Sequence, residues 1–229
     1  MSRFVFWDRM EPATKHLLLI TTLCFAVQVL CEHSGVRLDD VLGLHYWQAS
    51  KFNVMQTVSY MFMHGNFSHL FFNMFALWMF GTTVEQRLGT RKFVIFYLVC
   101  GIGAAIIQEL TWSINVNKLL GSLAAADANV LEIQALKHSV LNQMVTIGAS
   151  GAVFGLLLAY GWLFPEARVM FIFFPVPIPS RVFVAIYAVV ELLAGVANFQ
   201  FDNVAHYAHL GGMIFGALIL YYWKIRKEL

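Results

Sequence analysis

Charged residues are scarce in this sequence, and their scarcity excludes a water-soluble domain. Asp, Glu, Lys and Arg make up 12% of the 229 residues, whereas 59% are hydrophobic and the mean hydropathy is +0.68. Such a chain has too little polar surface to cover a soluble core. The formal net charge is only +2, which argues against nucleic acid as a partner. The sequence therefore predicts an integral membrane protein that is surrounded by the lipid bilayer.

Cysteine is also rare, which excludes a disulfide framework. The three cysteines, Cys24, Cys31 and Cys100, all lie in apolar stretches and are interpreted as small buried hydrophobic residues. The first apolar stretch lacks an A-x-A-like cleavage site, so it is expected to be a retained helix rather than a signal peptide. No internal repeat is apparent, and residues 1–229 are interpreted as one domain.

Alternation of polar and apolar residues is missing from the long hydrophobic stretches, which excludes a membrane β-barrel. A helix needs about 20 apolar residues to cross about 30 Å of hydrocarbon, and six stretches come close to that length. The prediction is an all-α polytopic membrane protein with six transmembrane helices. Their approximate ranges are 14–31, 68–88, 93–112, 146–164, 181–199 and 204–223.

The distribution of basic residues predicts the orientation. With the N-terminus inside, inner segments hold eleven of the 15 Lys and Arg residues, and the outer loops hold four. This bias predicts that both termini are cytoplasmic. The long segments 32–67 and 113–145 are then outer loops. Short tails without a targeting presequence suggest a bacterial cytoplasmic membrane, with an organelle membrane as the alternative.

Polar residues gather at one level of the predicted bundle. His69 and Asn73 share a face of the second helix, Ser150 lies about one turn into the fourth, and His209 lies five or six residues into the sixth. These three helices all enter from the outer side. The polar groups are therefore expected to form a shallow cavity that opens outward.

Glycines predict that the fourth and sixth helices touch. The fourth contains a G-x-x-x-G pair that begins at Gly151, and the sixth contains a ladder of small residues around Gly212. Ser150 and His209 flank these ladders, so a hydrogen bond between them is expected. Histidine can activate a serine nucleophile. His69, the Asn73 amide and the Ser150 backbone N–H are candidate oxyanion donors.

Three ordered motifs carry a family resemblance. "HGNFSHLFFNMF" in the second stretch, "GASGAVFG" in the fourth and "AHLGGMIFG" in the sixth resemble the rhomboid family of intramembrane serine proteases. The resemblance covers nearly all of the membrane core. It implies a serine endopeptidase that cleaves single-span membrane proteins at small residues near the outer face of the bilayer, without a cofactor or metal.

The resemblance also assigns roles to individual residues. It implies a dyad of Ser150 as nucleophile and His209 as general base, with no acidic third member, and an oxyanion-stabilising pair of His69 and Asn73. "GTTVEQRLG" resembles the family's Glu-x-Arg motif, which makes Glu85 and Arg87 structural ion-pair candidates. Supporting positions are His64, Gly148, Gly151, Phe154 and Gly212.

Two departures limit the resemblance. Met55 and Gln56 occupy positions where many relatives carry a Trp-Arg pair in the first outer loop. Phe154 stands where some relatives have a tyrosine that packs on the catalytic histidine. Ring packing survives this second change, but a phenolic hydrogen bond does not.

Two further titratable residues lie near this level. Glu191 is about eight residues from the outer end of the fifth helix, where a carboxylate is costly unless it is protonated or paired. One hypothesis is that Glu191 bonds a histidine or water near the site, and the alternative is a neutral Glu bonded to a neighbouring helix. His206 is either a group that supports the site or a wet interfacial histidine.

Two other function classes stay open at this point. A metal-dependent intramembrane hydrolase could use His64, His69, His206 and His209 as ligands, although no H-E-x-x-H motif occurs. A non-catalytic protein that binds membrane helices, or a small transporter, would need neither the serine nor the base. Transporters usually show paired repeats or broken helices, which this sequence lacks.

Overall fold

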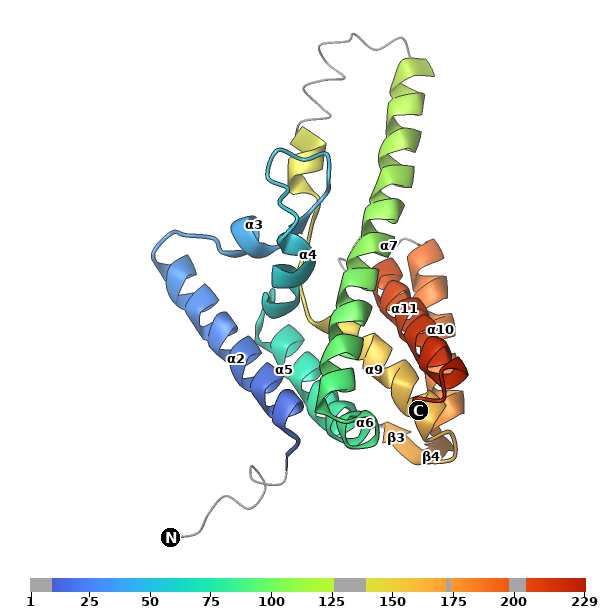
Figure 1. The fold of residues 1–229 in the computed structure, drawn as a ribbon. Helices are drawn as coiled ribbons and strands as arrows, with labels where there is room; N and C mark the ends of the chain where they lie inside the picture. The colour runs from blue at the N-terminus through green and yellow to red at the C-terminus, as the bar shows by residue number, and fades with distance from the viewer. Residues whose placement is uncertain (1–9, 126–138, 172–173, 198–204) are drawn as a thin grey trace.

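Helices occupy all six apolar stretches of the protein. The computed structural model describes residues 10–125, 139–171, 174–197 and 205–229 (Figure 1). Parts of three predicted segments lie outside the described residues, namely 126–138, 198–199 and 204. The long helical elements are α2 (Pro12–His33), α5 (Phe67–Ala76) continued by the π-helical η2 (Leu77–Gly81) and α6 (Thr82–Leu88), α7 (Thr90–Ala125), α9 (Ser150–Leu163), α10 (Ser180–Ala197) and α11 (His206–Ile225).

Three of these helices are long and apolar enough to cross a membrane by length and composition: α2, Thr90–Ser122 within α7, and α10. The length and apolar composition of these helices are those of an integral membrane protein. By contrast, α9 has 14 residues, or about 21 Å at 1.5 Å per residue. The count of six spans and the cytoplasmic position of both termini stay predictions.

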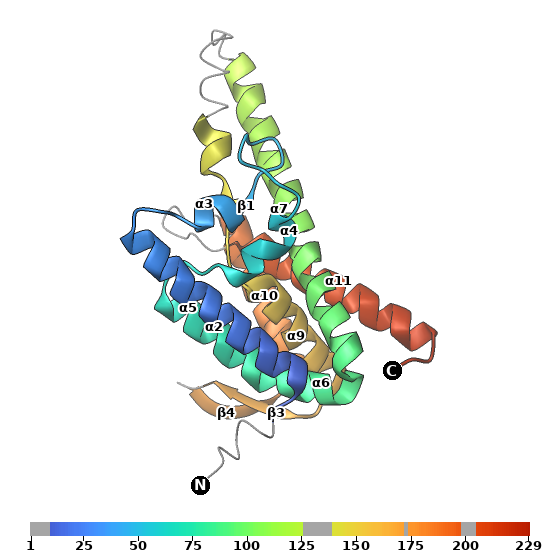
Figure 2. The same cartoon turned by 60° about the vertical axis from the view of Figure 1, so that its left-hand side comes forward.

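Helix α9 is the centre of the bundle (Figure 2). It contacts α7 and α11 along its length and also touches α6, η2 and α10. A Cβ atom on Gly212 of α11 would collide with the carbonyl group of Gly151 in α9. Only glycine at this position lets the two backbones approach so closely. The glycine ladders therefore join the fourth and sixth helices at the level of Ser150 and His209.

A buried carboxylate ties several helix ends together. Glu85 accepts hydrogen bonds from the backbone N–H groups of Ala13 and Thr14 at 2.9 and 2.7 Å, and from the Thr14 hydroxyl at 2.8 Å. The Thr90 hydroxyl donates to it at 2.9 Å. The expectation of ion pairs at Glu85 and Arg87 is not met within the described residues, where Glu85 instead caps the N-terminus of α2.

The C-terminus lies at the same end of the bundle as this carboxylate. Lys92, at the start of α7, pairs with Glu228 at 3.5 Å and also donates to its backbone carbonyl. The start of α2, the turn from α6 to α7 and the last residues of the chain therefore share one end (Figure 1). This arrangement agrees with an even number of membrane crossings.

The loops depart from an all-helical fold. In the loop between α2 and α5, α3 (Asp39–Leu42), α4 (Gln56–Ser59) and η1 (Tyr60–Phe62) flank β1 (Leu44–His45), which pairs with β2 (Val145–Thr146). The segment expected to be a short Pro-rich turn is a hairpin of β3 (Arg168–Phe171) and β4 (Phe174–Pro179). The prolines of β4 recur at every second residue, so they all lack an N–H group on the same edge of the strand. That edge is the one that does not pair with β3.

Two helix boundaries also differ from the prediction. Helix α7 continues to Ala125, well beyond the expected end at 112, and protrudes past the other helices (Figure 1). Helix α9 begins at Ser150 rather than at 146, because Val145 and Thr146 are extended in β2. Ser150 is therefore the first residue of its helix and does not lie one turn inside it.

Candidate active site

Ser150 stands at the entrance to α9, directly after a sharp turn. Gly148 in this turn has a φ of +128°, a conformation that L side chains rarely adopt. A Cβ atom at Gly148 would lie 2.8 Å from Nε2 of His69 and 3.6 Å from the Ser150 hydroxyl oxygen. The glycine thus permits the turn and keeps the space between the hydroxyl and the His69 ring open.

His209 faces Ser150 from the first turn of α11. Its Nε2 lies 2.8 Å from the Ser150 Oγ, and the residue is 7% exposed. The two residues are 59 positions apart in the chain, and the glycine contact between α9 and α11 brings them together. A serine hydroxyl within hydrogen-bond distance of an imidazole is the geometry that nucleophilic catalysis requires.

Phe154 limits the movement of the His209 ring. It lies one helical turn after Ser150, and its ring stacks on His209 with a centroid distance of 4.2 Å and an interplanar angle of 7°. On its other side, Phe154 contacts the Tyr187 ring edge-on at 6.1 Å. Phe154 therefore packs on the His209 ring, as expected for a phenylalanine that replaces the tyrosine of some relatives.

Two further titratable groups contact the other side of His209. Oε2 of Glu191 lies 2.9 Å from Nδ1 of His209 and 2.7 Å from Nδ1 of His206. Glu191 is 8% exposed, and it comes from α10, whereas both histidines come from α11. Of the two hypotheses for Glu191, the structure agrees with a hydrogen bond to a histidine near the site. A second histidine, His206, bonds the same carboxylate oxygen.

The candidate oxyanion donors come from α5. His69 lies beside Gly148, and its Nδ1 accepts a long hydrogen bond of 3.5 Å from the Gly65 N–H, which leaves Nε2 as the protonated nitrogen. The Asn73 amide donates to the backbone carbonyl of His69 at 2.9 Å. His69 is therefore placed to donate toward Ser150, while Asn73 would have to exchange its present partner.

His64 supports the loop before the serine. It is fully buried, and its Nε2 accepts the Ala149 N–H at 3.5 Å. Burial, together with the nearby His69 ring 5.0 Å away, lowers the pKa of the His64 imidazole to about 4. His64 is consequently neutral near pH 7 and contacts the residue that precedes the nucleophile.

The four histidines proposed as metal ligands do not gather at one point. Among the described residues, one group of histidine and carboxylate atoms lies close enough for a shared ion, and it consists of Glu191, His206 and His209. His64 and His69 contact each other, with ring centroids 5.0 Å apart, and are not members of this group. The expected ligand set of His64, His69, His206 and His209 is therefore not assembled.

Some contacts that shape the site have no signal in the sequence. The Gly148 N–H donates to the Tyr60 carbonyl at 2.9 Å, and the Tyr60 hydroxyl donates to the Gly101 carbonyl at 2.7 Å. Both contacts join segments that are about 40 or more residues apart. Tyr60 thereby connects the turn before Ser150 to α7.

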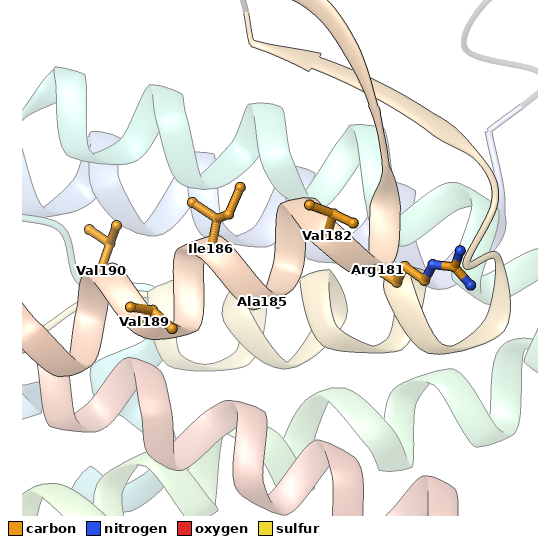
Figure 3. Close-up of a pocket in the computed structure, with 6 residues that line it drawn as sticks. All are labelled: Arg181, Val182, Ala185, Ile186, Val189 and Val190. Carbon is orange, nitrogen blue, oxygen red and sulfur yellow. The ribbon is translucent and has the colours of Figure 1, made fainter.

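A groove on α10 lies away from these residues (Figure 3). Its lining is aliphatic apart from Arg181 and comes from one face of the helix, at Val182, Ala185, Ile186, Val189 and Val190. Glu191 lies about 200° around the helix from Val189 at 100° per residue. The groove is therefore on the opposite side of α10 from the candidate site and carries no catalytic group.

Comparison with known proteins identifies the family. The rhomboid domain model matches residues 51–226. The chain is 32% identical to Rhomboid protein 1, mitochondrial, of Saccharomyces cerevisiae over 166 residues, which is 72% of this chain and 40% of the yeast protein. It is 24% identical to the rhomboid protease GlpG of Yersinia pseudotuberculosis over 212 residues, 92% of this chain and 63% of that protein. The chain thus spans less than two thirds of the length of these relatives. It belongs to the rhomboid family.

Proposed function

We propose that this protein is an intramembrane serine endopeptidase in which Ser150 is the nucleophile and His209 is the general base. The observation that carries the proposal is the 2.8 Å separation of the Ser150 Oγ and the His209 Nε2 across two helices. Membership of the rhomboid family and the name of GlpG as a rhomboid protease support it.

The chemistry follows from this pair. Nε2 of His209 takes the hydroxyl proton while Oγ attacks the carbonyl carbon of the scissile peptide bond, which gives a tetrahedral oxyanion. His209 then donates that proton to the leaving nitrogen, the C–N bond breaks, and an ester to Ser150 remains. Water attacks the ester after losing a proton to His209, and the proton returns to Oγ as the acid product leaves. These steps need no cofactor.

Donors around Gly148 would stabilise the oxyanion. The Ser150 N–H belongs to the first turn of α9, where backbone N–H groups have no partner inside the helix. Nε2 of His69 lies beside the open space at Gly148. The Asn73 amide could join them by leaving the His69 carbonyl. Such donors stabilise the transition state more than the ground state.

The place of the site in the bundle supports a membrane substrate. Ser150 and His209 both lie in first turns, at the opposite end of α9 from the end that holds α6 and the β3–β4 hairpin (Figure 1). If both termini are cytoplasmic, the site opens to the outer side. The proposed substrates are single-span proteins of a bacterial cytoplasmic membrane, cut at small residues near their outer end.

Proteolysis in liposomes tests the proposal. Wild type, Ser150→Ala and His209→Ala are compared on a tagged single-span substrate, with Ser122→Ala on the exposed part of α7 as the matched control. Cleavage by wild type and Ser122→Ala alone, unchanged by a chelator, is the expected result. Equal cleavage by Ser150→Ala contradicts the nucleophile, and loss of wild-type cleavage on chelation would instead favour metal-assisted hydrolysis.

A further inference from the structure

Glu191 places a carboxylate in the apolar part of α10, where the residue is 8% exposed. A carboxylate among spanning helices is costly unless it is paired, so its partners indicate what it does. Val182, Ile186 and Val189 form an aliphatic face of α10 (Figure 3), and at 100° per residue Glu191 lies on the opposite side of this helix. Glu191 therefore faces the bundle and α11.

Its partners are two imidazoles that share one oxygen. Oε2 of Glu191 forms hydrogen bonds with Nδ1 of His206 at 2.7 Å and with Nδ1 of His209 at 2.9 Å. These distances fall in the range of charge-assisted hydrogen bonds. A carboxylate oxygen can only accept, so both Nδ1 atoms carry a proton in this arrangement.

Because Nδ1 of His209 carries the proton, Nε2 has a free lone pair that faces the Ser150 hydroxyl at 2.8 Å. We propose that Glu191 is a positioning residue that completes a Ser150–His209–Glu191 triad by fixing this tautomer and orientation of His209. The inference rests on the proposed function and departs from the two-residue dyad that the family resemblance implies.

The carboxylate has a second effect once the reaction starts. When His209 takes the serine proton, its ring becomes an imidazolium whose charge lies 2.9 Å from Oε2. The carboxylate stabilises that charge without accepting the proton. His206 holds the same oxygen from the other side and so fixes its position between the two rings.

The distances favour hydrogen bonds over a shared metal ion. Ligand atoms about 2.1 Å from a tetrahedral zinc ion are about 3.4 Å apart. Oε2 lies only 2.7 and 2.9 Å from the two nitrogens, which is a hydrogen-bond separation. Glu191, His206 and His209 therefore form a hydrogen-bonded network.

Two substitutions of Glu191 separate orientation from charge. Glu191→Gln keeps an acceptor oxygen but loses the charge, and we expect kcat to fall about 10- to 100-fold. Glu191→Leu removes both, and we expect a fall of about 10³- to 10⁴-fold. KM should change little in either case, because Glu191 does not face the substrate. Glu109 receives the same two substitutions as the control, since it is a second glutamate of a long helix and, among the described residues, its side chain accepts only the Trp47 N–H of the loop.

The tautomer of His209 gives a readout that does not need turnover. In nitrogen-15 spectra of full-length protein labelled at histidine, with His209 identified by its loss in His209→Ala, we expect the Nδ1–H form in wild type and Glu191→Gln. The Nε2–H form should appear in Glu191→Leu. An unchanged tautomer in Glu191→Leu, or wild-type kcat in Glu191→Gln, overturns the proposal. If wild type cleaves no substrate, the tautomer still decides the role of Glu191 separately from the proteolysis.

Discussion

Glu85 and Glu191 are both buried glutamates, at opposite ends of the bundle, and they differ in the atoms that they bind. Glu85 is 1% exposed and accepts hydrogen bonds from backbone N–H groups and hydroxyls of Ala13, Thr14 and Thr90. Glu191 is 8% exposed and accepts them from His206 and His209. The partners of Glu85 are backbone amides and hydroxyls, whereas those of Glu191 are two imidazole rings.

Under the proposed mechanism, this difference separates a structural carboxylate from one that acts on the catalytic histidine. The donors around Glu85 keep their protons throughout, so Glu85 can only fix helix ends. One donor to Glu191 is an imidazole whose other nitrogen faces a serine hydroxyl, so any change at Glu191 reaches a reacting atom. Burial alone does not distinguish the two roles.

Of the substitutions that test this comparison, Glu85→Ala is expected to have the largest effect, and the effect is on stability. Glu85→Ala leaves the α2 N-terminus and two hydroxyls without their acceptor, and we expect a loss of about 3 kcal/mol in the free energy of unfolding. SDS titration in mixed micelles measures it, with the exposed Glu166→Ala as control. The kcat of the fraction that stays folded should equal that of wild type. A selective fall in that kcat would remove the distinction between the two carboxylates.

A smaller effect is expected when Glu191 loses one donor. His206→Phe removes the hydrogen bond of 2.7 Å and leaves Glu191 bonded to His209 alone. We expect kcat to fall about 10-fold, which corresponds to about 1.4 kcal/mol in the activation free energy, with little change in unfolding. Initial rates in liposomes check this, and the exposed His16→Phe on α2 is the control. Wild-type kcat would show that His206 does not hold the carboxylate.

The matching change at the other glutamate is Thr14→Val. It removes one hydroxyl donor to Glu85 while keeping the shape of the side chain and the backbone N–H bond. We expect a loss of about 1 kcal/mol in unfolding free energy and no change in kcat. The same SDS titration measures it beside Thr57→Val, an exposed position whose hydroxyl binds its own turn. A larger fall in kcat than in stability would contradict the separation.

The sequence predicts the six helical stretches because hydrophobic length is a local property. It also predicts the approach of Ser150 to His209, because glycines at Gly151 and Gly212 permit two helices to touch. The depth of Glu191 follows from counting residues along a helix. The rotation of α10 against α11 does not, and this rotation decides that His206 and His209 share one oxygen.

Other features depend on contacts between distant segments. The pairing of β1 with β2 joins residues about 100 positions apart, and the start of α9 depends on it. The hydrogen bond from Gly148 to Tyr60 is equally remote. Neither leaves a periodic pattern in the sequence, so the expected place of Ser150 inside its helix was wrong by about one turn.

A comparably small effect is expected at the ring that covers His209. Phe154→Leu removes a coplanar stack at 4.2 Å, and aromatic pairs contribute about 0.5–1.5 kcal/mol, so we expect kcat to fall about 3- to 10-fold. Phe154→Tyr keeps the ring and should stay near wild type. Phe80→Leu is the control, because it removes the Phe80–Tyr160 pair near the far end of α9 and should lower stability without lowering kcat. Equal kcat in Phe154→Leu and wild type would contradict a role of the stack in orienting His209. The orientation would then depend on Glu191, unlike any role of Glu85.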